Sequence, residues 1–504
     1  MAGWRDEDPG LPIKFGPCSN GEYEPEPLSP VITETIRRAR EECERNARRI
    51  GMGRREFLLS AMGAATTLLA LDACTREKLR ARTPGSSRSP RGASPTPGGT
   101  FVIPPEATTE SPAAEETVGG EEFVLDVQGH LLEFDVNPIN AEGEAFWRRF
   151  PQQNCGESDP RVCFDIEHFM TELFLRSDTT MAVLSALPIA PVGSPLSPEV
   201  MDETRRVAER LCHDERLLLH ALVLPNVGSP QGTLDAMGDR VERFPIRAWK
   251  TFTHYPDLWT GREEGWWLDD HERGVPKVGE AFIERAVELG VPIVATHKGL
   301  SGGSRFASPE DIGPAARRHP EVSFVAYHSG FETGVEEGPY RGATKTVGVN
   351  RLITSMRDAG VGPNQNVYAE LGSTWWYVMR TPTQAAHVLG KLLRFVGEDN
   401  VLWGTDSIFY GSPQDQIQAF RAFQITPEFR ERYGYPELTR EIKAKILGRN
   451  AARLYGVDPV TVPCEFTRSE LERIRRNLPG ANRTFGPTTT AEVQAFHDHH
   501  RGWP

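Results

Sequence analysis

The sequence predicts an α/β protein built on a (β/α)8 barrel. Three observations support this prediction: eight short apolar runs between residues 121 and 457, helical stretches that separate them, and titratable residues that close most of the runs. Continuous apolar runs are typical of strands in a parallel sheet that is covered on both faces. Eight such units in about 340 residues match the usual size of this barrel. A doubly wound open sheet is the alternative, but no glycine-rich phosphate loop follows the first run.

The eight predicted strands are short and strongly apolar. They are FVLDV (123–127), MAVLSAL (181–187), LLLHALVL (217–224), IRAWKTF (246–252), VPIVATH (291–297), VSFVAYH (322–328), NVYAEL (366–371) and NVLWGTD (400–406). The stretches between them are helical in pattern, and three have boundary residues that are typical of helix ends. SPEVMDETRRVAERLC begins with a Ser-Pro cap, PKVGEAFIERAVELG ends in glycine, and TPTQAAHVLGKLLRFVG has both features.

Residues 1–74 are predicted to form an N-terminal extension whose last part, residues 49–74, is an export signal. The pair Arg54 and Arg55 is followed by EFL, which resembles a twin-arginine signal. The uncharged stretch over residues 57–71 is too short to cross roughly 30 Å of hydrocarbon as a helix. A basic part, an apolar part and small residues follow one another in the order of a signal peptide. A buried N-terminal helix is the alternative interpretation.

This signal predicts export of the folded protein by the twin-arginine machinery, to the periplasm or the outer face of the cell membrane. The stretch ends in LDAC, which resembles a lipobox with Cys74 as the lipidated residue. Asp72 fits that pattern poorly, so a lipoprotein anchored through Cys74 and a protein without this anchor are both open.

Composition divides the rest of the chain into three parts. Residues 75–120 contain RTPGSSRSPRGASPTPGGT and PPEATTESPAAEETVGGEE, which are rich in Pro, Gly, Ser and Thr and have few apolar residues. Such composition is typical of a flexible, disordered linker. The barrel is therefore predicted over residues 121–457, and residues 458–504 form a C-terminal extension.

Charge and cysteine content bear on the class of partner. The net charge is −13 and no strongly basic face stands out, which argues against nucleic acid as a partner. The seven cysteines include no CxxC pair, so a zinc-finger or thioredoxin-type site is unsupported. Only Cys155 and Cys163 are close in sequence, and a disulfide and two free thiols are both open for them. A homo-oligomer is left open as well.

Titratable residues close most of the predicted strands. His130 follows the first strand, Lys250 ends the fourth, His297 ends the fifth, His328 ends the sixth, Glu370 lies in the seventh and Asp406 ends the eighth. The active sites of such barrels lie at these strand ends. Burial of these groups costs free energy unless they are paired, and a divalent cation would bind and neutralise them together. Imidazole and carboxylate ligands favour zinc first, with manganese or iron as alternatives.

The order of these residues resembles the amidohydrolase superfamily: a histidine after the first strand, then the histidines of VATH and VAYHSG, and the aspartate of LWGTD. Within the superfamily, the chain is most similar to the amidohydrolase-related family of metal-dependent hydrolases and non-oxidative decarboxylases. VLWGTDSIFYGSPQDQIQAF resembles the family's eighth strand and the loop after it, and IKAKILGRNAARLYGV resembles its C-terminal helix.

The resemblance implies a role for each residue at the strand ends. His130 and His297 would bind the metal, and Asp406 would be both a ligand and the general base toward a metal-activated water. His328 would complete the metal shell or polarise the substrate carbonyl. Lys250 stands where some members of the superfamily use a carboxylated lysine that bridges two metal ions.

Gln128 departs from the pattern of the family, which is Asp-x-His-x-His; this chain has Asp126-x-Gln128-x-His130. A glutamine offers only a weak, neutral oxygen where an imidazole would bind firmly. We therefore expect one metal ion rather than two, displaced from the first strand toward Lys250, His297 and His328. His130 would then be a weak ligand or a residue that contacts a ligand.

Four residues are candidates for contact with a small-molecule substrate: Glu370, Trp375, Arg305 and Gln128. Glu370 would contact the substrate or a metal ligand. Trp375 in a loop after the seventh strand would line an apolar pocket or plug the rim. Arg305 would meet a carboxylate or lie exposed.

Three hypotheses on function follow. The first is a metal-dependent hydrolase that directs an activated water at a carbonyl-type bond of a small molecule. The second is a metal-dependent decarboxylase, a carbon–carbon lyase with the same ligands. The third is an inactive, exported barrel that binds a ligand, for which Gln128 is the support in the sequence.

Overall fold

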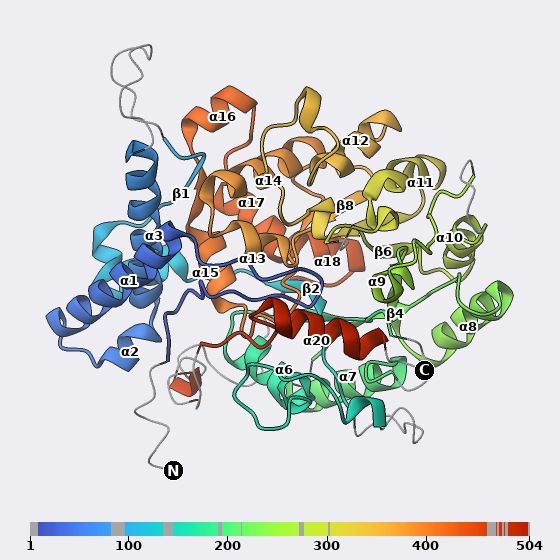
Figure 1. The fold of residues 1–504 in the computed structure, drawn as a ribbon, viewed down its shortest axis with the longest axis horizontal. Coiled ribbons are helices and arrows are strands. Elements are labelled where there is room, and N and C mark those ends of the chain that lie inside the picture. Colours follow the sequence, from blue (N-terminus) through green and yellow to red (C-terminus); the bar gives the residue numbers. More distant parts are fainter. Residues whose placement is uncertain are drawn as a thin grey trace.

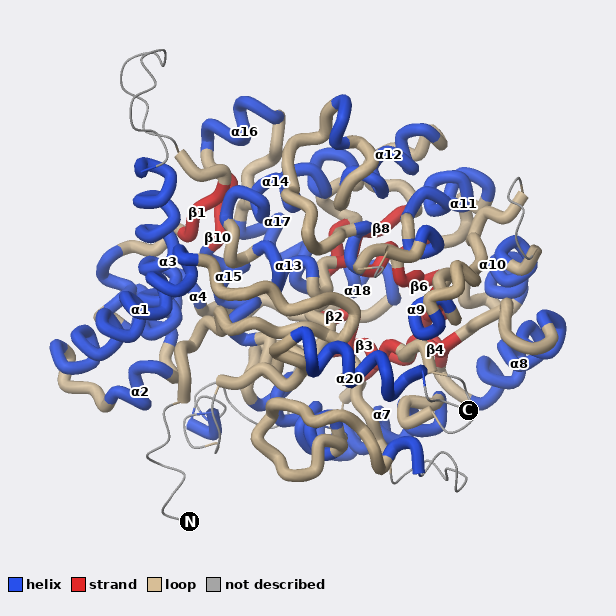
Figure 2. The backbone as a smooth tube through the Cα atoms, in the orientation of Figure 1, coloured by secondary structure: helices blue, strands red, loops and turns tan. Residues whose placement is uncertain are grey.

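The computed structural model describes residues 9–81, 96–134, 145–189, 194–212, 214–271, 277–300, 303–460, 470, 473–475, 478 and 482–501. Eight parallel strands form one sheet in sequence order, surrounded by helices (Figures 1 and 2). The strands are β2 (Leu125–Gly129), β3 (Met181–Ser185), β4 (Leu217–Leu222), β5 (Ile246–Phe252), β6 (Ile293–His297), β7 (Ser323–Tyr327), β8 (Val367–Glu370) and β9 (Val401–Leu402).

The sheet closes on itself between its first and last strands. The Val127 amide donates a hydrogen bond to the Trp403 carbonyl over 3.0 Å, and Gly129 forms a parallel bridge with Ser407. Every residue of β2, β3 and β4 is buried, which explains why the runs are continuously apolar rather than alternating. All eight predicted strands and the (β/α)8 barrel are confirmed.

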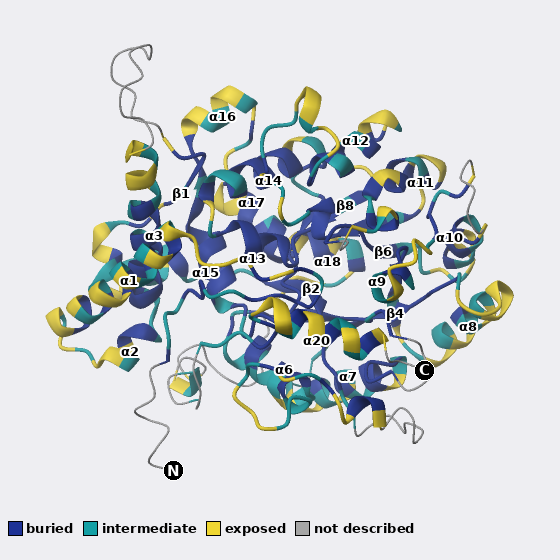
Figure 3. Cartoon of the chain, viewed as in Figure 1, coloured by how far each residue is buried: buried dark blue, intermediate teal, exposed yellow. Residues whose placement is uncertain are grey.

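Helices cover the outside of the barrel, with their buried faces inward and exposed faces outward (Figure 3). Those between the strands and after the last one are α6 (Ile166–Met170), α7 (Pro198–Cys212), α8 (Pro230–Arg243), α9 (Asp257–Thr260), α10 (Gly279–Glu288), α11 (Ile312–Arg318), α12 (Asn350–Asp358), α13 (Thr374–Val378), α14 (Pro382–Phe395), α15 (Gln414–Ala422), α16 (Pro427–Tyr433), α17 (Arg440–Ala444) and α18 (Asn450–Tyr455). The boundary residues act as their types predict: the Ser229 hydroxyl caps α8 by accepting from the Gly232 amide, and Gly397 adopts a φ of 108° after α14.

Residues 49–74, predicted to be an export signal, are part of the folded protein. They lie in the end of α1 (Pro30–Arg49), in α2 (Arg54–Leu58) and in α3 (Ala61–Ala81), which packs against α1 and α4. The apolar stretch is buried in this contact, as is the Cys74 side chain. The arrangement matches the alternative of a buried N-terminal helix, and a role in export stays a prediction.

The flexible linker predicted over residues 75–120 is wrong for residues 75–81, which belong to α3, and for residues 96–120. β1 (Gly99–Phe101) pairs antiparallel with β10 (Phe423–Ile425), and α4 (Ser111–Val118) packs against α3 and α15. The few apolar residues of this part, among them Phe101 and Val118, are buried in the core. A few apolar residues are thus enough to hold the segment in place, because their side chains are buried in the core. Residues 82–95 lie outside the described part of the chain.

Both ends of the chain return to one face of the barrel. Residues 9–29 run beside α20 (Thr490–Arg501), which belongs to the predicted C-terminal extension (Figure 1). Lys14 anchors the N-terminal segment, since its Nζ lies 2.8 Å from Asp415 Oδ1 and its backbone amide donates to Asp415 Oδ2 over 3.1 Å. The Ser19 amide donates to the Pro487 carbonyl, which joins the two ends.

Cys155 and Cys163 form a disulfide, with 5.6 Å between their Cα atoms. The structure thus has the disulfide rather than two free thiols, the two alternatives that the sequence left open. Among the helices that the structure describes, none has the length and apolarity of a membrane span.

Replacement of Lys14 by alanine is expected to lower the free energy of unfolding by about 3–5 kcal/mol, because Asp415 would stay buried without its partner. Urea unfolding measures this loss, and limited proteolysis should show earlier cleavage within residues 9–29. The control is Arg45→Ala, which removes an exposed pair with Glu42 and should cost at most about 1 kcal/mol. Equal losses in the two variants would contradict the anchoring role of Lys14.

Candidate functional site

The predicted strand-end residues meet at the carboxyl ends of the barrel strands. The pairing of Phe252 with His297, and of His297 with Tyr327, places the ends of β5, β6 and β7 at one level. Seven polar side chains gather there, each at most 4% exposed: Gln128, His130, Lys250, His297, His328, Glu370 and Asp406. Such burial of polar groups requires partners inside the barrel.

The backbone at this rim is strained where the polar residues lie. His328, Ser373 and Asp406 have φ angles of 63°, 53° and 60°, in the left-handed region. Each such residue costs about 1–3 kcal/mol, and such residues cluster at functional sites. Glu370 helps to hold this shape, since its carboxylate accepts hydrogen bonds from the backbone amides of His328, over 3.0 Å, and Gly372. Burial raises the pKa of Glu370 to about 8.

His130 and His328 are oriented by backbone carbonyls. His130 Nδ1 lies 2.6 Å from the Ser185 carbonyl oxygen, and His328 Nδ1 lies 2.8 Å from that of Gly372. A carbonyl can only accept, so Nδ1 carries the proton and a neutral ring has its lone pair on Nε2. Metal-binding histidines are commonly held in this way.

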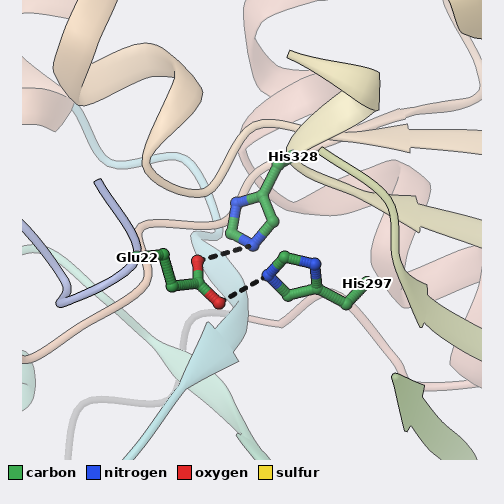
Figure 4. A group of neighbouring side chains, drawn as sticks. All are labelled: Glu22, His297 and His328. Atoms are coloured by element: carbon green, nitrogen blue, oxygen red, sulfur yellow. Dashed lines mark ion pairs between the residues drawn. The ribbon is translucent and has the colours of Figure 1, made fainter. Parts of the chain in front are cut away.

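Glu22, which sequence analysis missed, enters this group from the N-terminal segment (Figure 4). Its Oε1 lies 2.7 Å from His297 Nε2, and its Oε2 lies 4.0 Å from His328 Nε2. The short contact lacks hydrogen-bond geometry, and neither ring nitrogen of His297 has a hydrogen-bond partner among the described residues. The ligand atoms of Glu22, His297 and His328 all lie within 4.8 Å of one another.

This group fits a divalent metal ion. Two imidazole nitrogens and a carboxylate oxygen suit zinc, manganese or iron. Burial is the main cause that holds the pKa of His297 well below its usual range, and this favours the neutral ring that a metal ligand needs. The two histidines of the group lie at the ends of β6 and β7 rather than at β2, and one ion displaced from the first strand stays a prediction.

Asp406 lies beside this group and has a full set of partners. Oδ1 accepts from Gln128 Nε2 over 2.9 Å and lies 3.1 Å from His130 Nε2. Oδ2 accepts from the Ser373 hydroxyl over 2.6 Å and from Asn20 Nδ2 over 2.7 Å. Burial alone would raise the pKa of Asp406, but the hydrogen bond and charge of His130, the charge of His328 and the Ser373 hydroxyl hold it below its usual range. Asp406 is therefore a carboxylate.

A cavity of about 50 Å³ opens above these groups, with a polar floor and apolar walls. Its floor includes Gln128 and Lys250, and its roof includes Phe496 and His500 of α20. Because a buried water needs at least about 10–15 Å³, the cavity has room for only a few small groups. Helix α20 forms part of the lining of this cavity.

Lys250 reaches the cavity without a hydrogen-bond partner for its Nζ among the described residues. The Nζ lies 3.6 Å from the centre of the Tyr327 ring and 4.5 Å from that of Phe252, a cation–π arrangement. Burial lowers the pKa of Lys250 to about 7. Lys250 lines the same cavity as Glu22 and His297, and its carboxylation stays a prediction.

The structure corrects two of the predicted substrate contacts. Trp375 packs in the core against Phe420 and Phe423, and its Nε1 donates to the Gln416 carbonyl over 2.9 Å. Arg305 is exposed on the surface. Neither residue lines the cavity, because aromatic or basic character in a loop after a strand does not determine which way the side chain points. Glu370 supports the backbone, whereas Gln128 does line the cavity.

Asn20 and His254 also belong to this site, and of these two sequence analysis missed Asn20. Asn20 donates from Nδ2 to both Glu22 Oε2 and Asp406 Oδ2, each over 2.7 Å. His254 is fully buried with its ring 4.7 Å from that of His297, and neither of its nitrogens has a hydrogen-bond partner in the described part. No local pattern distinguishes Asn20 or Glu22 from other polar residues of the N-terminal extension. His254 follows the fourth strand in FTHYP, where the sequence predicts either a pocket residue or a solvated loop histidine; the structure has it buried beside His297.

The family model described as Amidohydrolase matches residues 195–457. No curated protein matches the chain. Among solved structures, the chain is similar to an uncharacterised TIM-barrel protein from Bordetella bronchiseptica, with 16% identity, a TM-score of 0.40 and coverage of 66% of this chain and 98% of that one. It is also similar to 5-carboxyvanillate decarboxylase from Sphingomonas paucimobilis, with 12% identity, a TM-score of 0.39 and coverage of 67% and 100%.

Addition of Zn²⁺ or Mn²⁺ to the chelator-treated protein is expected to raise its melting temperature. An ion present at 100 times its dissociation constant adds about 2.7 kcal/mol to the stability of the folded state. Differential scanning fluorimetry measures the shift, which should be largely lost in His297→Ala. The control is His319→Ala, which lies away from the site beside Glu280. A full metal-induced shift in His297→Ala would contradict the assignment of His297.

Proposed function

Because the chain belongs to the amidohydrolase family, we propose that it is a metal-dependent hydrolase that cleaves a carbonyl-type bond of a small molecule. The observation that supports this most is the buried group of imidazoles and carboxylates at the mouth of the barrel. One divalent ion, zinc first, would supply Lewis acidity there, which polarises a carbonyl and lowers the pKa of water.

Asp406 is the general base in this proposal. Its carboxylate lines the cavity and is fixed by Gln128, Ser373 and Asn20 through hydrogen bonds of 2.6–2.9 Å. A base held in one position can take a proton from an attacking water without reorganisation. Asp406 Oδ1, which faces His130 Nε2, is the atom that receives this proton.

His328 acts as a metal ligand rather than as a proton donor. Its Nδ1 proton is engaged by the Gly372 carbonyl, so Nε2 of the neutral ring can accept a metal but cannot donate to a carbonyl oxygen. Lys250 is the group that can hold an anionic oxygen, since it lines the cavity and its Nζ has no hydrogen-bond partner among the described residues.

Lys250 also favours the second candidate, a metal-dependent decarboxylase. An ammonium group on the floor of a cavity with apolar walls suits the carboxylate of a small acid. In that reaction the carbon–carbon bond would break, carbon dioxide would leave, and the remaining carbon would take a proton. The third hypothesis, an inactive binding barrel, loses its support from Gln128, because the amide of this residue is used to hold Asp406.

Export by the twin-arginine route stays part of the proposal. The disulfide between Cys155 and Cys163 supports it, because disulfides persist mainly in oxidising compartments. A lipid anchor on Cys74 would require removal of residues 1–73, which include Glu22. We therefore propose an exported protein that retains these residues and has no anchor at Cys74.

Asp406→Asn is expected to lower kcat by about 10²–10⁴-fold, because the amide cannot take a proton from water. The assay uses p-nitrophenyl acetate, δ-valerolactone and acetanilide, with release of carbon dioxide from hydroxybenzoic acids measured in parallel. Asp399→Asn is the matched control, since Asp399 lies before β9 and pairs with Lys445 on the surface. Unchanged hydrolysis by Asp406→Asn would contradict the proposal, and carbon dioxide release without hydrolysis would favour the decarboxylase.

A further inference from the structure

The carboxylate of Glu22 is placed as a metal ligand although it lies far outside the barrel in sequence. Its side chain is 13% exposed. Hydrogen bonds from the described residues reach Oε2, through Asn20, but not Oε1. A carboxylate oxygen with so little access to water requires a positive or hydrogen-bonding partner, and the ion-pair contact of Oε1 is with His297 Nε2, at 2.7 Å.

The contact between Glu22 and His297 has the geometry of two ligands rather than of a hydrogen bond. Oε1 and Nε2 are 2.7 Å apart without the angles of a hydrogen bond, and both His297 nitrogens lack a hydrogen-bond partner in the described part. Two electron-pair donors can lie at such a short distance when both of them face one cation. The Nε2 of His328, with its lone pair fixed by the Gly372 carbonyl, is the third donor.

The first strand leaves room for such a ligand. Gln128 occupies the position where the resemblance implies a histidine, and its amide turns toward Asp406 Oδ1 at 2.9 Å. It also lies 3.5 Å from His328 Nε2. The first strand therefore contributes one imidazole to the rim, that of His130, and the carboxylate of Glu22 compensates for the missing second imidazole.

The residue after Glu22 links the N-terminal segment to Asp406. The Tyr23 hydroxyl lies 2.9 Å from that of Tyr410, which lies 2.6 Å from the Ser373 hydroxyl, and Ser373 donates to Asp406. This chain of hydrogen bonds ties the segment to the general base. The segment is thus positioned by the active site itself.

The residue before Glu22 is held by α20. His497 Nε2 donates to the Gly21 carbonyl over 2.7 Å. Gly21 has a φ of 93°, and a Cβ there would lie 2.7 Å from the Phe496 ring, so only glycine allows this close approach. Glu22 is therefore held from both sides before any ion binds, which is the arrangement that a ligand requires.

We infer that Glu22 is a ligand of the metal ion, with His297 and His328, and that residues 9–29 are a permanent part of the active protein. This inference rests on the proposed function, because it assigns a ligand to the same site. It also gives a role to the helices α1–α3: they join the ligand-bearing segment to the barrel, and cleavage before Cys74 would remove the ligand.

The test is metal binding by the full chain carrying Glu22→Gln. The amide keeps the shape of the side chain but offers only a weak neutral oxygen. Titration of the chelator-treated protein with Zn²⁺, in competition with a chromogenic chelator, should show an affinity for Zn²⁺ that is weaker by about 100-fold or more. Loss of a residue that only hydrogen-bonds to a ligand lowers metal affinity by about 10–100-fold. The matched control is Glu24→Gln, an exposed carboxylate of the same segment, which should bind as the wild type does.

Each outcome separates the inference from the proposed function. Equal Zn²⁺ affinity in the wild type and Glu22→Gln overturns the inference and leaves the proposed function intact. A wild type that binds no Zn²⁺ overturns the proposed function and the inference together.

A second variant applies if Glu22→Gln does not fold, as judged by circular dichroism. Glu22→Asp keeps the charge but draws the carboxylate back by one methylene. The visible spectrum of the Co²⁺-loaded protein should then change, because a ligand atom has moved. An unchanged Co²⁺ spectrum in Glu22→Asp would overturn the inference.

Discussion

The buried contact between Glu22 and His297 is the constraint on which the rest of the site depends. A carboxylate oxygen and an imidazole nitrogen lie 2.7 Å apart without hydrogen-bond geometry, at a place with little access to water. A cation that faces both groups would neutralise the carboxylate and accept the lone pair of the imidazole. The orientation of His328 by a backbone carbonyl and the hydrogen bonds around Asp406 complete a site that is prepared for that cation.

The two ends of the chain build this site together with the barrel. The N-terminal segment brings Asn20 and Glu22 to the strand ends, and α20 brings Phe496 and His500 over the cavity. The buried pair of Lys14 with Asp415 and the contact of His497 with Gly21 hold these ends in place.

The barrel and the strand-end residues were predictable because both are local features. An apolar run indicates a buried strand. The residue that ends the run lies at the rim of the barrel, because all strands of a parallel barrel end on the same side. Glu22 was not predictable, since its position depends on how a segment about 270 residues earlier than His297 folds back. Tertiary contacts likewise determine that residues 96–120 are ordered, that α3 is buried and that Trp375 points into the core. Composition and sequence motifs predicted otherwise for each of these.

Anomalous diffraction at the zinc edge from crystals of the Zn²⁺-loaded full chain tests the central claim most directly. Our account predicts one peak, with an oxygen of Glu22 and the Nε2 atoms of His297 and His328 within about 2.0–2.2 Å of it. A peak held by His130 and Asp406, with Glu22 beyond coordination distance, would contradict it.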